Sequence, residues 1–297
     1  MKPKKMKQSA SEKALIYGIH IIVLLLSLLC LIPLFYTVSA SISTGAALDA
    51  GKVFLWPVGF NLDAYKLLLT KHNIVRYFTN STFLTVVGTV LSLFATILCA
   101  YPLSKKYLFR RKTISFFITF TMLFGGGMIP TFLQVRNLGL MNSYWSIWLT
   151  SLISPYNMMV MRSFFDGIPE ELDESAKIDG CGEWRLLFQI YLPLSKAVLA
   201  TETLFYGVSY WNTYQRIMLY IQDTKKYTLP VFIQQIVFQL QQLDTDTVDA
   251  VNAGITDVVS EGVKSAGVVV LIVPMLIVYP FLQKYFVKGV TLGAVKG

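Results

Sequence analysis

The sequence has little of what most enzyme and metal sites require. Its 297 residues include 2 histidines and 3 cysteines. His20 and His72 lie far apart, and neither a zinc site nor a nucleophile–base pair can be assembled from them. Cys30 and Cys99 lie in apolar runs and Cys181 in an acidic segment, so neither a disulfide framework nor a metal knuckle is indicated. The sequence therefore predicts a chain with no metal site of its own.

A nucleotide-binding loop is also missing. Residues 45–53, GAALDAGKV, are one residue too long for a P-loop, and neither Ser nor Thr follows Lys52. This chain is therefore not expected to bind ATP or to be an enzyme. Asp244 and Asp246 form a DxD element like the one that holds a metal in glycosyltransferases, which leaves a membrane-embedded enzyme as an alternative. Asp249 misses the calcium-loop spacing, and a solvated outer loop explains these aspartates more simply.

Charged residues are scarce as well, at 14%, whereas hydrophobic residues make up 54% and the mean hydropathy is +0.55. The apolar residues form long runs, and a helix that spans a bilayer needs about 20 of them. We therefore predict an all-α integral membrane protein with a single transmembrane domain over residues 1–297. The first run is expected to stay as an anchor. The six predicted spans are 14–38, 76–103, 113–133, 144–165, 197–220 and 263–283.

Positive charge sets the expected orientation of these spans. The net charge is +9, and the cations gather in the N-terminal MKPKKMK, between residues 105 and 112, and in a tail over 284–297. Lys and Arg are enriched in cytoplasmic loops, and even numbers of spans put all three segments on one side. Both termini are therefore expected in the cytoplasm. Cations at the ends of apolar runs are typical of membrane proteins, so no nucleic-acid partner is expected.

One short segment gathers carboxylates in this otherwise apolar chain. Seven of the 17 acidic residues lie between Asp166 and Glu183, between the fourth and fifth predicted spans and thus on the cytoplasmic side. Pro169 and the acids after it suit a helix start, Gly180 suits a helix stop, and a second helix fits residues 183–190. Two isolated helices this short have marginal stability in water, so the segment needs a partner surface to pack against.

This segment resembles the EAA signature of ABC importer permeases, which reads EAA, three residues, G, nine residues, I-x-L-P. The matching residues are Glu174-Ser175-Ala176, Gly180 and Ile190-Tyr191-Leu192-Pro193, and every spacing fits. Ser175 stands where the signature has alanine, and it is small enough to keep close packing. In this family the segment is a coupling helix that docks in a groove on an ATPase subunit. The resemblance implies that segment 166–193 presents its carboxylates to that partner and couples through Glu174, Ser175, Ala176, Asp179, Gly180, Ile190, Leu192 and Pro193.

The resemblance extends over nearly the whole chain. Tyr210-Trp211-Asn212 is similar to the W-N element of carbohydrate-type permeases, and residues 124–143 are similar to the branch associated with complex oligosaccharides. The tail over 284–297 is very similar to the ending of the second permease subunit in maltose-type importers. There the tail can reach between the two ATPase subunits, which implies ATPase contacts from Gly293, Ala294, Lys296 and Gly297.

What this resemblance implies is an importer made of several chains. The chain is expected to be a multi-pass permease of the bacterial cytoplasmic membrane, in contact with lipid. Its partners are expected to be a second homologous permease, two cytoplasmic ATPase subunits and an extracytoplasmic solute-binding protein. ATP and Mg would bind to the ATPase, so no cofactor is expected in this chain. The cargo would be an oligosaccharide, moved by alternating access; a non-sugar solute and a transport-like sensor remain alternatives.

Sugars are bound by aromatic faces and by polar groups that match their hydroxyls. Tyr206, Tyr210 and Tyr214 recur every four residues on one face of the fifth predicted span. Asn212 lies nearby, and Asn157 offers an amide in the fourth span. An aromatic stripe also suits helix packing or interface anchoring, and this alternative stays open. The candidates for the translocation path are Tyr206, Tyr210, Trp211, Asn212, Tyr214 and Asn157.

Three further features of the predicted spans lie outside these motifs. The glycines at 125–127 precede Pro130 in the third span, where they either break the helix or let helices pack closely, and packing is the preferred interpretation. Glu202 is an ionisable residue inside the fifth span, expected to face a wet cavity or to pair across a subunit interface. Small residues from Ser81 to Ala100 form a stripe on the second span, which indicates close packing.

Overall fold

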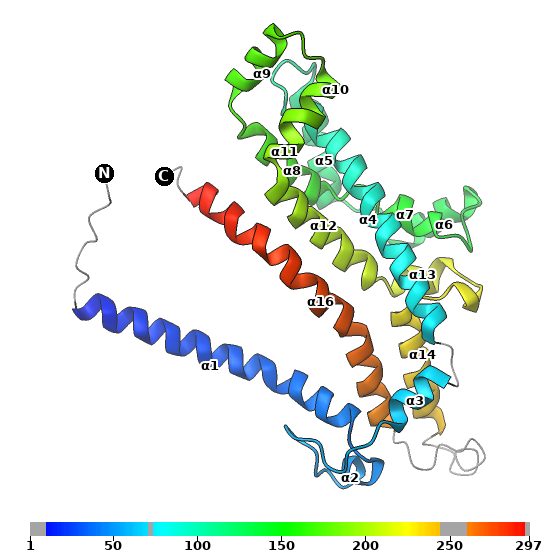
Figure 1. Ribbon diagram of the computed structural model, residues 1–297. Helices are drawn as coiled ribbons and strands as arrows, with labels where there is room; N and C mark the ends of the chain where they lie inside the picture. Colours follow the sequence, from blue (N-terminus) through cyan, green and yellow to red (C-terminus); the bar gives the residue numbers. More distant parts are fainter. Residues whose placement is uncertain (1–9, 71–73, 244–259, 295–297) are drawn as a thin grey trace. The chain divides into compact units, whose positions relative to one another are not determined.

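Helices make up the regular structure of this chain in the computed structural model, which describes residues 10–70, 74–243 and 260–294 (Figure 1). Within these ranges the β-pairing consists of one isolated bridge between Ser43 and Phe60. The all-α prediction is therefore confirmed for the described residues. The helices are α1 Ala10–Ser41, α2 Gly45–Asp49, α3 Asp63–Thr70, α4 Ile74–Ser104, α5 Arg111–Leu123, α6 Met128–Asn137, α7 Trp145–Thr150, α8 Pro155–Asp166, α9 Glu170–Ile178, α10 Glu183–Leu186, the π-helix η1 Leu187–Tyr191, α11 Leu192–Leu194, α12 Lys196–Trp211, α13 Gln215–Tyr220, the 3₁₀-helix η2 Thr224–Lys226, α14 Leu229–Leu243 and α16 Ser260–Ala294.

The chain divides into two compact units. In the first unit, the end of α1 meets α2 around a small core of Ala40, Ala47 and Val53. An added Cβ on Gly262 would lie 3.3 Å from the Leu48 side chain, so the start of α16 packs closely against α2. The first unit comprises residues 1–72 and 236–270, and the second comprises 73–235 and 271–297.

In the second unit, α4 packs along α12 and α8, and Figure 1 shows α4 and α12 side by side. The small residues of α4 lie in these contacts. Ser92 and Thr96 are fully buried, and the Ser81 hydroxyl accepts a hydrogen bond from the Leu229 N–H at 2.8 Å. Small side chains let helix backbones approach closely. The stripe of small residues on the second predicted span is therefore a packing surface, as predicted.

Three helices in the described part of the chain are long and apolar enough to cross a membrane. They cover Leu15–Ser41, Ile74–Ser104 and Glu261–Pro280, and they correspond to the first, second and sixth predicted spans. Their most apolar stretches have mean hydropathies between 2.1 and 2.8. Helices of this length and composition are typical of membrane proteins.

The third predicted span is broken. α5 and α6 lie at 113° to each other across the glycines at 125–127. Gly127 has a φ of 83°, which a residue with a Cβ rarely adopts, and an added Cβ on Gly125 or Gly126 would find no neighbour within 4 Å. The preference for close packing at these glycines was wrong, because they end one helix and turn the chain into the next. Taken together, the two helices are apolar enough to count as a fourth span.

The fourth and fifth predicted spans are each divided between two helices. α8 starts afresh at Pro155, where the Ser154 hydroxyl accepts a hydrogen bond from the Asn157 N–H at 3.4 Å. A capping serine followed by proline at the first helical position is a strong helix start. α12 ends at Trp211, and α13 begins at Gln215. The apolar runs predicted one continuous helix in each place, and the chain interrupts both.

Candidate functional site

The predicted helix–turn–helix is present in the second unit. α9 carries Glu170, Glu171 and Asp173 in its first turn, where they complement the positive end of the helix dipole. Gly180 has a φ of 75° and turns the chain after α9, and α10 begins at Glu183. Only a residue without a Cβ adopts this conformation at low cost. The glycine of the signature is therefore required by the turn between the two helices.

The end of the signature forms a π-helix, which the sequence did not predict. η1 covers Leu187–Tyr191, and the helical path continues through α11 to Leu194, beyond the predicted end at residue 190. Both Leu187 and Tyr191 are buried in a core cluster that they share with α4 and α8. π-helical turns are rare and often occur at functional sites. Part of the partner surface that the short helices need is thus supplied by the chain itself.

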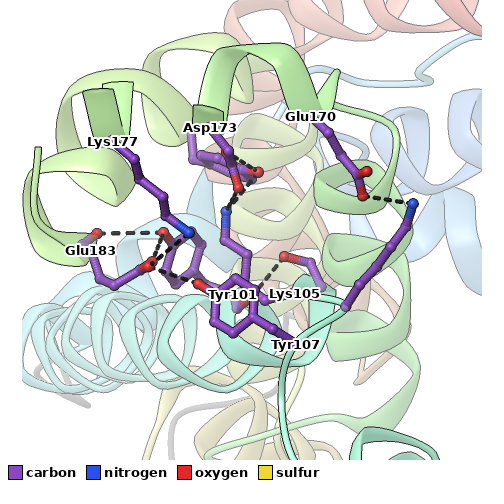
Figure 2. A network of polar contacts seen from close by, with 10 residues as sticks. Tyr101, Lys105, Tyr107, Glu170, Asp173, Lys177 and Glu183 are labelled. Carbon is purple, nitrogen blue, oxygen red and sulfur yellow. Dashed lines mark hydrogen bonds and ion pairs between the residues drawn. The ribbon is translucent and has the colours of Figure 1, made fainter. Parts of the chain in front are cut away.

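A buried lysine ties these helices to the end of α4 (Figure 2). Lys105 is 5% exposed, and its ammonium group contacts the carboxylate of Asp173 on α9. The Tyr191 hydroxyl accepts a hydrogen bond from Lys105 at 2.8 Å and donates one to Asp173, also at 2.8 Å. The three side chains form a closed triangle, which we call the lysine triangle. It joins the end of α4, α9 and η1.

Two further ion pairs link the connection after α4 to the acidic segment. The Lys106 Nζ lies 2.6 Å from the Glu170 Oε1, and the Arg111 Nη2 lies 2.7 Å from the Asp166 Oδ1. The first pair is exposed and the second is partly buried. Exposed pairs of this kind contribute little to stability, about 0–1 kcal/mol. The exposed Lys106–Glu170 pair is therefore expected to contribute little to stability.

Two tyrosines bind the carboxylate of Glu183 (Figure 2): the hydroxyls of Tyr101 and Tyr107 each donate a hydrogen bond to it at 2.7 Å. Burial acts to raise the pKa of Glu183, but these hydrogen bonds outweigh it and hold that pKa below its ordinary value. Burial and the neighbouring carboxylates raise the pKa of Tyr107 and of Tyr191. Four of the seven carboxylates of the segment are thus bound within the chain. These four carboxylates have partners within the chain, and the expectation that the segment faces an ATPase stays a prediction.

The predicted coupling residues lie on both faces of the helix pair. Ala176 is buried in the core, and Gly180 has open space around it. The Ser175 hydroxyl donates to the Glu171 carbonyl at 2.8 Å, so serine at this place in the signature is satisfied within its own helix. The other predicted coupling residues are exposed or half-buried: Glu174, Asp179, Ile190, Leu192 and Pro193.

An apolar face of the helix pair remains uncovered. Ile178 is 86% exposed, Trp184 65% and Phe188 49%. The rings of Trp184 and Phe188 stack, with their centroids 6.2 Å apart. Three acids of the segment form no ion pair with another described residue: Glu171, Glu174 and Asp179. The exposed surface of the helix pair therefore includes both apolar side chains and carboxylates without an ion pair.

The tail is described only in part. Gly293 and Ala294 close α16. Lys296 and Gly297 lie outside the described residues, as do Asp244 and Asp246 of the DxD element.

Three of the six predicted sugar-path residues, Asn157, Tyr206 and Tyr210, line a polar cavity of about 370 Å³ in the second unit. The hydroxyls of Tyr206 and Tyr210 on α12 are hydrogen-bonded to those of Thr96 and Ser92 on α4, at 2.7 and 2.8 Å. Tyr206 also accepts a hydrogen bond from the Ser154 N–H at 3.0 Å. Both tyrosines are buried and also line the cavity, so packing and lining are combined in them. The lining consists of Thr150, Ser151, Ile153, Ser154, Pro155, Asn157, Phe205, Tyr206, Ser209, Tyr210 and Arg216.

A smaller cavity of about 270 Å³ shares Ser209 and Arg216 with the first. Asn212 and Tyr214 line this smaller cavity. Trp211 lines neither: it is buried, and its indole N–H donates to the Leu271 carbonyl at 3.1 Å. The structure therefore brings together five of the six predicted path residues around two adjoining cavities, and it places the tryptophan in a packing role.

Arg216 was missed by the sequence analysis. It lies on α13, lines both cavities, and donates a hydrogen bond to the Ser151 hydroxyl. It also falls inside the fifth predicted span, 197–220. An ionisable residue in an apolar span is costly and is a functional candidate by default, and that signal could have found it.

Glu202 is fully buried in α12, and neither carboxylate oxygen has a hydrogen-bond partner among the described residues. It lines neither of the two polar cavities. A wet cavity and pairing across a subunit interface both stay predictions for Glu202.

The apolar helices and the exposed helix–turn–helix define a membrane permease. The chain belongs to the family described as the binding-protein-dependent transport system inner membrane component, which matches residues 86–292. Such a permease is a subunit of an ABC importer that depends on a solute-binding protein and leaves ATP hydrolysis to a separate subunit. The predictions of an importer permease and of a chain that is not itself an enzyme are confirmed. The glycosyltransferase interpretation finds no support.

Individual proteins are similar over nearly the full chain. The polygalacturonan/rhamnogalacturonan transport system permease protein YtcP of Bacillus subtilis (strain 168) is 42% identical over 95% of this chain and 97% of its own. Protein LplC of the same strain is 42% identical over 90% of each chain. A chain from a bacterial ABC transporter involved in the import of the acidic polysaccharide alginate is 34% identical. That match covers 95% of this chain and 100% of the other, with a TM-score of 0.84.

Proposed function

We propose that this chain forms half of a two-permease pore in the bacterial cytoplasmic membrane. Two cytoplasmic ATPase subunits, which bind ATP and Mg, and an extracytoplasmic solute-binding protein complete the machine. The chain crosses the membrane six times as a single domain over 1–297, with both termini in the cytoplasm and with interrupted third, fourth and fifth spans. The observation that carries this proposal is the exposed helix–turn–helix, because it combines the EAA spacing with an uncovered apolar face.

The cargo is an oligosaccharide, moved by alternating access. Support comes from the relatives, which are named for polygalacturonan, rhamnogalacturonan and alginate transport. The two cavities support it as well, since Asn157, Ser209 and Asn212 offer polar groups for sugar hydroxyls. Tyr214 and Phe205 add aromatic faces at the edges of the cavities. A non-sugar solute is the alternative, and uptake assays separate the two.

Coupling runs through segment 166–193, which docks in a groove on an ATPase subunit. Burial of Ile178, Trp184 and Phe188 there would contribute about 1.5–3 kcal/mol for each fully buried side chain. The free acids Glu171, Glu174 and Asp179 face cations of the partner. The tail adds a second contact with the ATPases through Gly293, Ala294, Lys296 and Gly297.

A pair of glycine variants tests the coupling role. Gly180→Val places a β-branched residue at a φ of 75°, which is strained whatever the space around it. Gly182→Val is the matched control, because Gly182 has a φ of −76° and also has open space around it. We expect Gly180→Val to lower oligosaccharide uptake and cargo-stimulated ATPase activity by about tenfold or more, the change that 1.4 kcal/mol produces. Gly182→Val is expected to keep both.

Both variants are compared at equal abundance in the membrane, in complexes purified with their ATPase. Equal activity of the two variants would contradict the coupling role of the turn. A complex that hydrolyses ATP but moves no solute would instead favour the sensor alternative.

A further inference from the structure

Arg216 differs from the cations around the coupling segment in having no ion pair, and from other unpaired cations such as Arg136 in lining the two polar cavities. Lys105, Lys106, Arg111 and Lys177 each lie within 4 Å of a carboxylate. Arg216 forms no such pair with any described residue, and its hydrogen-bond partner there is the Ser151 hydroxyl. A guanidinium group carries five N–H donors. Most of the donor capacity of Arg216 is therefore left for something other than the described part of the chain.

The surroundings of Arg216 are polar but carry no negative charge. The described residues that line the two cavities include no acid, and Arg216 is the single charged residue among them. Hydroxyls and amides surround it, from Ser154, Asn157, Ser209 and Asn212. A cation held in such a cavity attracts an anion, and no carboxylate of the lining competes for it.

The shape of the Arg216 guanidinium group indicates which class of anion it would bind. The planar fork of an arginine matches the two coplanar oxygens of a carboxylate, and such paired hydrogen bonds are both strong and specific. The walls match a sugar ring, since Tyr206 and Tyr210 line the cavity and Phe205 is 39% exposed at its edge. We infer that Arg216 binds the carboxylate of a uronic-acid unit, so that these cavities take an acidic oligosaccharide. This inference rests on the proposed function, whose cargo it specifies.

Equilibrium binding to the permease–ATPase complex in lipid nanodiscs tests this inference without the selectivity of the solute-binding protein. The probes are trigalacturonate and trimannuronate, the methyl esters of both, and maltotriose. A methyl ester keeps the sugar chain and removes the negative charge. We expect the wild-type complex to bind trigalacturonate or trimannuronate more tightly than the methyl ester of the same trisaccharide. Added salt should weaken the binding of that acid form.

Arg216→Gln is expected to weaken binding of that acid form by about tenfold or more, the usual size of a lost charge-assisted hydrogen bond. Binding of its ester should be unchanged. Arg216→Lys keeps the charge without the fork and should fall between wild type and Arg216→Gln. Arg136→Gln is the matched control, because Arg136 is an exposed cation on α6 that lines neither cavity.

The outcomes separate the inference from the function on which it rests. Equal weakening of acid and ester in Arg216→Gln would mean a structural effect and would overturn the inference. So would unchanged binding of the acid. If the wild-type complex binds maltotriose or the esters but no acid, the oligosaccharide permease stands and the acidic cargo falls. If it binds none of the saccharides, the proposed cargo falls as well.

Discussion

At the coupling segment, Lys105 is nearly buried and is held by Asp173 and Tyr191. At the two polar cavities, Arg216 has a hydroxyl as its partner and is exposed. Both residues are cations of the same unit: Lys105 directly follows α4, and Arg216 lies on α13. A buried charge needs a partner within the protein, since leaving it alone costs several kcal/mol. An exposed cation that lines a cavity can remain without an internal anion and bind a ligand. The combination of a cavity and a missing internal anion therefore distinguishes Arg216 from Lys105.

The two regions also differ in how their geometry is fixed. The lysine triangle joins three segments through an ion pair and two hydrogen bonds, so we expect a movement of α9 to displace the end of α4. The cavity wall is fixed by packing and by neutral hydrogen bonds between α4 and α12. We therefore expect substitutions to act differently in the two regions. Removing a charge should destabilise the lysine triangle, and adding side-chain atoms should destabilise the cavity wall.

The largest effect is expected from Lys105→Met. The substitution keeps the apolar stem but leaves Asp173, which is 14% exposed, without its cation. Removing one partner of a buried ion pair costs about 3–5 kcal/mol, and we expect about 3 here because Asp173 retains some exposure. The measurement is thermal unfolding of the permease–ATPase complex in detergent.

The double variant Lys105→Met/Asp173→Leu is the control, because it removes both charges. It should recover much of the lost stability, since an apolar pair can replace a buried ion pair at little cost. Lys106→Met, at an exposed ion pair, should lose less than about 1 kcal/mol. A Lys105→Met protein as stable as wild type would show that the lysine triangle is not structural.

Features that depend on nearby residues could be predicted from the sequence. The turn at Gly180 and the three long spans are of this kind, because a glycine stop and an apolar run act locally. The lysine triangle could not be predicted, since Lys105 and Asp173 lie 68 positions apart and meet only through the packing of α4 and α8. The interruption before Pro155 carried a local signal, a serine followed by a proline. The length of the apolar run outweighed that signal in the prediction.

An intermediate effect is expected from Gly88→Ala at the cavity wall. An added Cβ on Gly88 would lie 2.8 Å from the Tyr210 ring, which is buried and tied to Ser92 by its hydroxyl. Overpacking of this kind costs about 1–3 kcal/mol. Gly207→Ala on the facing helix is the control, because its Cβ would find its nearest neighbour at 3.8 Å. We expect thermal unfolding to be earlier for Gly88→Ala and unchanged or slightly later for Gly207→Ala. Equal midpoints would mean that the ring moves freely and that the wall is not rigid.

The smallest effect on stability is expected from Arg216→Met, and it is the sharpest test of the contrast with Lys105. The side chain is exposed, and its removal leaves Ser151 as the one described partner to be re-solvated. Substitutions at such positions usually change the free energy of unfolding by less than about 0.5 kcal/mol. Arg136→Met, on α6, should behave in the same way. If Arg216→Met instead unfolds as early as Lys105→Met, then Arg216 holds the fold through contacts of its own. Its unpaired charge would then be no guide to the ligand, whereas an unchanged midpoint leaves its donors free to bind an anion from outside the chain.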